Sequence, residues 1–348
     1  MLGHARAGGR AEADDPMPPG GRTSTPLSTV PRNTLTRSSK TTLITGRGNI
    51  MASSASQTGT AGPQLAGYGP AAVKPNSITR WSLDGSSLLK VYRTITPHER
   101  RRREVHALRI AAGWGFSVPS VVSTGEYGAH PWAVFGAVPG KPCSIRTARG
   151  VQGFVRHVIT ATHQFHRGVA GLCPGSGWRW RPGDMLGSNR GFLLDQLSSR
   201  CRQLSWWHDL EDALVSCDEL PTVYLHGDLK PEHLLFDGDR LHIVDWEASG
   251  RGPAMCDQAD ATFHVIRDLI YTAARPHRLP IGIVSQLGST GPALAWRLVL
   301  WLDRRRAGDI HLIPARDLYQ LAAEDDPAAA CEQLVRLVSR LRTAGVPR

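Results

Sequence analysis

The pattern of apolar and polar positions divides the chain into a first part with strand signals and a second part with helix signals. Strand-like runs cover residues 77–82, 88–92, 118–125 and 132–137. Asp84-Gly85 lies between the first two runs and predicts a hairpin. Helical periods cover residues 151–168, 193–217, 255–275, 292–307 and 328–343. Strands early and helices late predict an α+β fold, with a small β-rich N-lobe and a larger helical C-lobe.

A further helix between the strands carries its own boundary signals. Thr96 can cap it, Pro97 suits its first turn, and Glu99 completes a capping box three residues after Thr96. Gly113 and Gly115 then end its apolar stripe. We therefore predict a helix that starts at Pro97 and ends near Gly113.

Residues 1–60 show neither period and are rich in Gly, Pro, Ser, Thr and Arg. Such a segment buries too little apolar surface to offset its ordering entropy, so we predict a disordered tail. Its lack of acidic residues from Gly21 to Thr60 also resembles a transit peptide. We prefer a third interpretation, in which the translation start is assigned too early and the protein begins at Met51. The reason is that the composition rich in Arg, Ala, Gly and Pro continues along the whole chain. The rest divides into an N-lobe at 61–139 and a C-lobe at 140–348.

Composition narrows the function classes. The chain of 348 residues is 41% hydrophobic and 20% charged, with a formal net charge of +11, which is typical of a basic globular protein. This charge favours phosphate-rich ligands or acidic peptides and argues against a polycationic substrate. There is no basic stripe with interleaved aromatics, so we expect no dedicated nucleic-acid binding.

Cysteine usage and hydropathy indicate the setting. Six cysteines are scattered without a C-x-x-C pair, which favours a reduced, cytoplasmic protein. No run approaches the roughly 18 apolar residues of a membrane span. The apolar stretch Leu294–Leu302 is short and is interrupted by Arg297. We therefore expect no membrane partner.

Most of the candidate chemistry lies between residues 224 and 247. The strand-like run Val223–Leu225 leads into a loop that contains Asp228. Residues 234–236 then lead outward, 237–239 turn, and 241–244 lead back. Because the two runs are of similar length, we predict that Asp245 returns to the same end of the hairpin as Asp228 and His233.

This stretch resembles the aminoglycoside phosphotransferase family, the small-molecule kinase branch of the protein-kinase-like fold. The residues that carry the likeness are His226-Gly227-Asp228-Leu229-Lys230-Pro231-Glu232-His233 and the later Asp245. Gly227 matches this branch, whereas Lys230-Pro231-Glu232 is similar to serine/threonine protein kinases. The resemblance covers roughly residues 65–275 and implies a bilobal fold whose N-lobe binds the nucleotide. It also implies a structural role for Asp257, while His226 is better explained as holding the loop than as a base.

The resemblance assigns a role to each candidate residue. Phosphoryl transfer needs the phosphates neutralised, a metal held and the acceptor hydroxyl aligned. Asp228 would orient the hydroxyl, Lys230 would offset the charge of the γ-phosphate, and Asp245 would bind Mg²⁺. Lys90 would bind the α- and β-phosphates of ATP with Glu104 as its ion-pair partner. Residues 135–139 are similar to the hinge that contacts adenine.

His233 departs from the family, which has asparagine at this position. Imidazole is a better ligand for zinc, copper or nickel than for Mg²⁺. Three interpretations of His233 therefore stay open. His233 acts through a water beside the metal, or favours Mn²⁺ over Mg²⁺, or marks an impaired site. Because Lys90, Glu104, Asp228, Lys230 and Asp245 are all present, we favour an active enzyme.

The sequence thus predicts an ATP- and metal-dependent phosphotransferase that acts on a hydroxyl of a small molecule. Two alternatives remain. The same chemistry with a peptide Ser/Thr as acceptor, including an acidic peptide, would suit the basic surface. A nucleotide-binding pseudokinase would keep the fold without turnover.

Overall fold

The computed structural model describes residues 65–93, 96–168, 188–238, 240–272, 279–306 and 308–348. The chain divides into two units, Met1–Ser53 and Ser54–Arg348, and all described residues belong to the second. The predicted tail at 1–60 and the alternative start at Met51 lie outside the described residues. The domain boundary predicted at residues 139/140 stays a prediction.

An antiparallel sheet forms the first part of the described chain. Its five strands follow the order β1-β2-β3-β5-β4. They are β1 (Ala72–Val73), β2 (Ser77–Trp81), β3 (Ser87–Tyr92), β4 (Val121–Tyr127) and β5 (His130–Gly136). The predicted hairpin is confirmed, because β2 pairs with β3 and Gly85 takes the positive φ of 70° that its turn requires.

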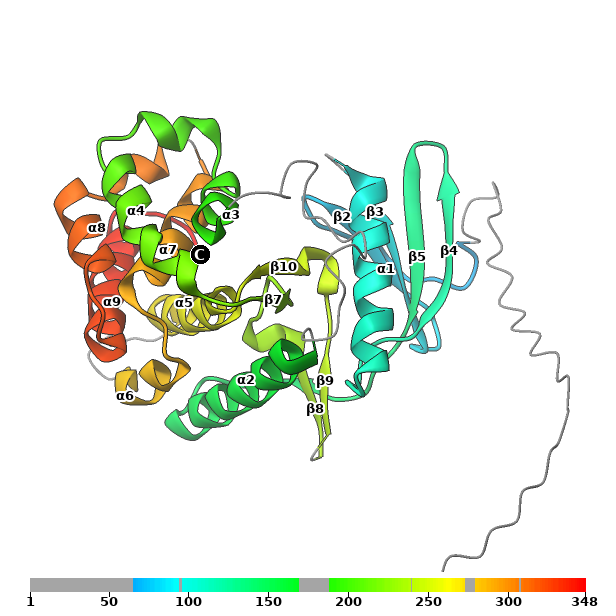
Figure 1. Ribbon diagram of the computed structural model, residues 1–348. Helices are drawn as coiled ribbons and strands as arrows, with labels where there is room; N and C mark the ends of the chain where they lie inside the picture. Colours follow the sequence, from blue (N-terminus) through cyan, green and yellow to red (C-terminus); the bar gives the residue numbers. More distant parts are fainter. Residues whose placement is uncertain (1–64, 94–95, 169–187, 239, 273–278, 307) are drawn as a thin grey trace, which may run out of the picture. The chain divides into compact units, whose positions relative to one another are not determined.

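Helix α1 (Pro97–Gly113) lies against β3, β4 and β5 (Figure 1). The predicted start at Pro97 and end at Gly113 are confirmed, but the predicted capping box is wrong. Thr96 adopts a left-handed conformation with φ 57° and its side chain makes no capping hydrogen bond. Glu99 instead accepts a hydrogen bond from Arg103 Nη2 at 2.8 Å, an interaction along one helix face.

Two small sheets follow in the second part. Strand β7 (Thr222–Leu225) pairs with β10 (Gly250–Pro253), and β6 (Lys141–Pro142), β8 (Leu234–Asp237) and β9 (Arg240–Ile243) form the other sheet. The predicted hairpin between residues 234 and 244 is confirmed, since Leu234 pairs with Ile243. Strands β1, β6 and β10 carry no clear period-2 pattern and were not predicted.

Helices make up most of the remaining chain. They are α2 (Ala148–Gly168), α3 (Asn189–Asp195), α4 (Trp207–Ala213), α5 (Met255–Thr272), α6 (Ile281–Val284), α7 (Gly291–Asp303), α8 (Ala315–Ala322) and α9 (Pro327–Thr343). Buried α5 and α7 lie at the centre and pack against α9, and α8 packs on α7 (Figure 1). The predicted α+β class, with the sheet first and the helices later, is therefore confirmed. No helix among the described residues has the length and apolar character of a membrane span.

The helix predicted at 193–217 is wrong. This stretch contains the end of α3, two short 3₁₀ segments and α4. Ser198 interrupts the helix because its N–H and its hydroxyl donate to the two carboxylate oxygens of Asp303, at 2.8 and 2.6 Å. A partner so far along the sequence leaves no sign in the local pattern.

A second apolar cluster connects the sheet region to the hairpin that carries the candidate site. It contains Leu108 of α1, Phe135 of β5 and Phe165 of α2, together with Ile243 and Trp246. Close packing of this kind leaves few voids and gives the interior low compressibility. The cluster also contains Tyr92 of β3, so it packs the strand that carries Lys90 against the hairpin that leads to Asp245.

Candidate active site

The loop after β7 is held by a buried carboxylate from α5. Asp257 is fully buried, and its two oxygens accept hydrogen bonds from the backbone N–H groups of His226 and Gly227 at 3.0 and 2.9 Å. Buried carboxylates are tolerated where backbone donors satisfy them in this way. Asp257 thus has the structural position that the resemblance implies.

Gly227 allows this loop to pass close to the segment after β9. Its φ is 79°, and a side chain there would place Cβ 2.3 Å from the carbonyl oxygen of Ala248. Both the backbone conformation and the space therefore require glycine. A larger residue at this position would displace the loop that carries Asp228.

His226 holds the loop from its own side. Its Nε2 donates to the carbonyl oxygen of Val244 at 3.0 Å, and its Nδ1 accepts from the N–H of Asp228 at 3.3 Å. The ring is fully buried and lies 4.7 Å from the Trp246 ring, centroid to centroid. Both ring nitrogens are occupied, so the geometry supports a structural role rather than that of a base.

The hairpin β8–β9 returns the chain to the loop. The N–H of Val244 donates to the carbonyl oxygen of His233 at 3.0 Å, which continues the pairing beyond the strands. Asp245 then turns with a φ of 63°, a left-handed conformation that aspartate tolerates better than most residues. The structure therefore brings Asp228, His233 and Asp245 together.

Lys90 joins the sheet region to this hairpin. Its ammonium lies 2.8 Å from Glu104 Oε2, 2.8 Å from Asp245 Oδ1 and 2.9 Å from Glu247 Oε2. Glu104 also accepts a hydrogen bond of 2.7 Å from the Tyr92 hydroxyl. The three carboxylates form an acidic cluster that is able to hold a cation, and the Lys90 ammonium takes that place.

Burial and charge oppose each other in this cluster. Burial lowers the pKa of Lys90, but the three carboxylates outweigh it and hold that pKa well above its usual value. Burial raises the pKa of Glu104 to about 7, against the effect of Lys90. Burial also acts to raise the pKa of Asp245, yet Lys90 and His233 bring it well below its usual range.

His233 lies between the two aspartates. Its Nδ1 is 2.9 Å from the carbonyl oxygen of Asp228, and its Nε2 is 3.3 Å from Asp245 Oδ2. Because a carbonyl oxygen only accepts, Nδ1 carries a proton. In the neutral ring, Nε2 then directs a lone pair towards the Asp245 carboxylate.

Two acceptors that face each other at this distance need a proton or a metal cation between them. A carboxylate oxygen and an imidazole nitrogen form a donor pair that fits a divalent cation. Asp245 and His233 are therefore also able to hold a metal in this site.

The two oxygens of Asp228 contact different groups. Lys230 Nζ donates to Oδ2 at 2.8 Å, whereas Nε2 of His264 lies 3.4 Å from Oδ1. Burial acts to raise the pKa of Asp228, but His264, His233 and Lys230 hold it well below its usual range. Asp228 is therefore a carboxylate that stays ionised and can accept a hydrogen bond.

Four residues of the site were missed by the sequence analysis. Glu247 contacts Lys90, and His264 contacts Asp228. Arg297 Nη2 lies 2.9 Å from Nε2 of His264, and its Nε donates to the buried Asp260. Arg297 left a signal as the one charge inside the apolar stretch 294–302, because an arginine there requires a buried partner. His264 and Asp260 lie on the same helix, where the surrounding sequence does not set them apart in the way that an apolar stretch sets apart Arg297.

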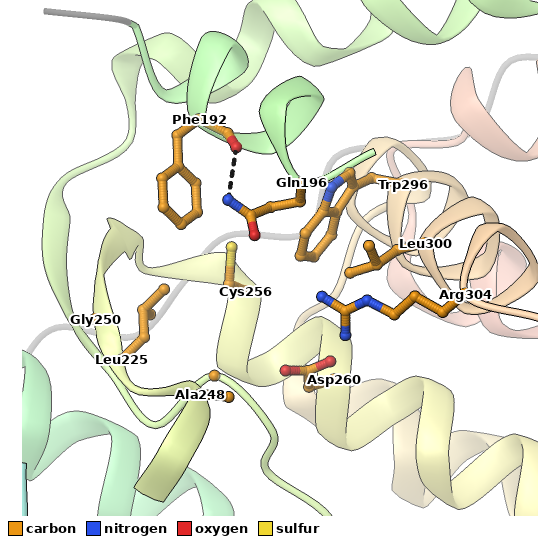
Figure 2. A pocket seen from close by; sticks show the side chains of 11 residues that line it. Phe192, Gln196, Leu225, Ala248, Gly250, Cys256, Asp260, Trp296, Leu300 and Arg304 are labelled. Atoms are coloured by element: carbon orange, nitrogen blue, oxygen red, sulfur yellow. Dashed lines mark hydrogen bonds between the residues drawn. The ribbon is translucent and has the colours of Figure 1, made fainter. Parts of the chain in front are cut away.

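A small cavity lies beside the loop (Figure 2). Gly227 is among its lining residues. Leu225 lies on one side of the cavity, and Trp296 and Leu300 of α7 lie on another. Figure 2 shows Asp260 and Arg304 at the same end of this cavity. The chain therefore leaves a small space between the loop at Gly227 and helices α5 and α7.

The sequence matches one protein family. The phosphotransferase enzyme family (APH) matches residues 77–280, which is more than half of the chain and includes the site residues named above from Lys90 to His264. No curated protein matches the chain.

Several solved structures are similar at low identity. Aminoglycoside phosphotransferase APH(2'')-Ib with bound ADP is 13% identical, with a TM-score of 0.48, over 73% of this chain and 91% of that chain. The apo form of a thermostable mutant of APH(4)-Ia is 15% identical, with a TM-score of 0.49, over 82% and 98%. APH(3'')-Id from Streptomyces rimosus is 18% identical, with a TM-score of 0.44, over 78% and 94%.

Proposed function

Because the chain belongs to the phosphotransferase enzyme family, we propose that it moves the γ-phosphate of ATP to a hydroxyl group of a small molecule in a metal-dependent reaction. The observation that carries this proposal is the convergence of five candidate residues at one place. Lys90 contacts Asp245, Asp245 contacts His233, and His233 contacts Asp228, which in turn binds Lys230.

Lys90 and Glu104 are proposed to bind the nucleotide phosphates. The ammonium stays charged because three carboxylates surround it, and Glu104 fixes its position from the buried side. A fixed, buried positive charge stabilises phosphate oxygens more strongly than an exposed lysine does. Glu247 is proposed to share this role, since it contacts Lys90 from the hairpin side.

Asp245 and His233 are proposed to hold the metal, either Mg²⁺ or Mn²⁺. Asp245 presents Oδ2 towards Nε2 of His233, while its Oδ1 is held by Lys90. A divalent ion bound there would offset negative charge on the transferred phosphate. Imidazole favours Mn²⁺ relative to an asparagine oxygen, which binds Mg²⁺ well.

Asp228 is proposed to accept the hydrogen bond of the acceptor hydroxyl and to align its oxygen with the γ-phosphorus. Its low pKa suits orientation of the hydroxyl better than early removal of the proton. Lys230 is proposed to move from Asp228 Oδ2 to the γ-phosphate when the nucleotide binds, where its charge stabilises the transferred group.

Replacement of the proposed acceptor-orienting residue tests this function. Asp228→Asn keeps the size of the side chain but removes its charge, so we expect kcat to fall by about 10²–10⁴-fold with nucleotide affinity nearly unchanged. Calorimetry with ATP and Mg²⁺ or Mn²⁺ gives the affinity, and ATP consumption gives kcat. Unchanged turnover in this variant would refute the assignment. Nucleotide binding by the wild-type chain without turnover, across a broad acceptor panel, would favour a pseudokinase instead.

A further inference from the structure

A second hollow lies beside Asp228 and is strongly basic. It has a volume of about 640 Å³, which is within the usual range for a small-molecule site. Five arginines and one histidine line it: His264, Arg267, Arg297, Arg304, Arg305 and Arg306. No acidic residue is among the described residues that line it.

Local carboxylates neutralise only part of this charge. Arg297 binds Asp260, and Arg267 binds Asp268 at 2.6 Å. Arg305 donates to the main-chain oxygen of Arg348. The hollow therefore keeps a net positive charge.

Arg304 and Arg306 are free to bind a ligand. Within the part of the chain that the structure describes, neither guanidinium group makes a hydrogen bond or an ion pair, and both residues are exposed. A guanidinium presents planar N–H groups that match carboxylate and phosphate oxygens. Two such groups in one hollow are suited to an anion.

The hollow is connected to the proposed active site through His264. This side chain lines the hollow and is only 4% exposed, and its Nε2 lies 3.4 Å from Asp228 Oδ1. Its buried Nδ1 has no hydrogen-bond partner among the described residues.

We propose that this arginine-lined hollow binds an anionic group of the acceptor, so that the acceptor is a hydroxyl compound that also carries a carboxylate or a phosphate. This inference rests on the proposed function, because the bound anion is an acceptor only if the chain transfers phosphate to it. An anion held by Arg304 and Arg306 would place its hydroxyl on the Oδ1 side of Asp228. A polycationic acceptor would instead meet five guanidinium groups and be repelled.

Binding of simple anions tests the hollow without any turnover. The full chain is titrated with citrate and, separately, with inorganic phosphate, without nucleotide or metal and at constant ionic strength. We expect the Arg304→Ala/Arg306→Ala variant to bind the preferred anion about tenfold more weakly than the wild type, since each lost contact is charge-assisted. Arg316→Ala, which removes an exposed arginine of α8, is the matched control and should bind like the wild type. Equal affinity in all three proteins would overturn the proposal.

Acceptor preference provides the second arm. Phosphate transfer is compared for glycerate with glycerol, for gluconate with glucose and with cationic glucosamine, and for glucose with a glucose phosphate. We expect an anionic compound to be preferred, and its KM to rise about tenfold or more in Arg304→Ala/Arg306→Ala while the KM for ATP is unchanged. Arg304→Lys/Arg306→Lys should recover part of this loss. A neutral or cationic best acceptor with an unchanged KM in the variant would contradict the proposal.

The two proposals fail in different ways. Absence of transfer by the wild type would count against the proposed function, whereas loss of citrate or phosphate binding in the arginine variant would still support an anion site. Transfer to a neutral acceptor with no effect of the arginines would leave the proposed function standing and remove this inference.

Discussion

Lys90 is the residue at which the charges of the site converge. A buried ammonium with three carboxylate partners is stabilising only while the partners remain, because an unpaired buried charge is costly. Several residues of this site were predicted from the sequence alone. Lys90 and Glu104 were assigned from the family resemblance, and the structure places Lys90 Nζ 2.8 Å from Glu104 Oε2. Glu247 was not, because its contact depends on the turn at Asp245.

Removal of the Lys90 charge should separate its structural effect from its proposed effect on the nucleotide. We expect Lys90→Met to lower the free energy of unfolding by about 3 kcal/mol, because Glu104 is left buried without its cation. Lys90→Met/Glu104→Gln should recover about 1 kcal/mol or more, since Tyr92 can still donate to the amide oxygen. ATP affinity should stay low in both variants. Urea unfolding and calorimetry measure the two effects, and recovery of ATP affinity in the double variant would contradict the role of Lys90.

His233 is the residue for which the sequence left three interpretations open. Its contacts with Asp228 and Asp245 support a place beside the metal. We therefore expect His233→Asn to stay active with Mg²⁺ and to lose preference for Mn²⁺, since an amide oxygen is the harder ligand. His233→Ala should lose about tenfold or more in metal-dependent turnover.

Titration of activity with each metal distinguishes these outcomes for the His233 variants. Equal turnover of the wild type and His233→Ala across both titrations would show that His233 does not act on the metal.

At the scale of elements, the hairpin β8–β9 and the loop before it determine the geometry of the site. The hairpin was predictable because a turn signal, Asp237-Gly238, separates two apolar runs of equal length. The broken helix around Ser198 was not, because its cause is a hydrogen bond to Asp303 on α7. Local sequence signals thus predicted the hairpin near the site. The helix break depends on a partner distant in sequence and could not be predicted in this way.

Gly227 tests the fit between the loop and the segment after β9. Gly227→Ala would force Cβ against the Ala248 carbonyl oxygen and strain a positive φ. We expect a loss of about 1–3 kcal/mol in stability and at least a tenfold drop in kcat, because the loop that carries Asp228 would shift. Gly238→Ala, which has a similar φ of 59° but open space around it, is the matched control. The control shares the backbone strain, so a kcat loss as large in the control would refute the effect of the Ala248 contact.

At the scale of the whole described unit, the fold class was predictable but the acceptor side was not. The order of strands and helices follows from local periodicity, and the match to the phosphotransferase enzyme family agrees with it. The basic hollow is assembled from α5, from α7 and the residues after it, and from the last residues of the chain. Arginines at positions 267, 297 and 304–306 are unremarkable in a chain of net charge +11, and only the fold brings them together in one hollow with His264.

Transfer of the γ-phosphate is the central claim, and ³¹P NMR follows it directly. The full chain is incubated with ATP, Mg²⁺ or Mn²⁺ and the acceptor panel, with Asp228→Asn as the control. The account predicts that the γ-phosphate signal of ATP disappears while an equal phosphomonoester signal of the acceptor and an ADP signal grow, and that Asp228→Asn abolishes this change. No change in either metal, or conversion of ATP into ADP and inorganic phosphate alone, would contradict the account.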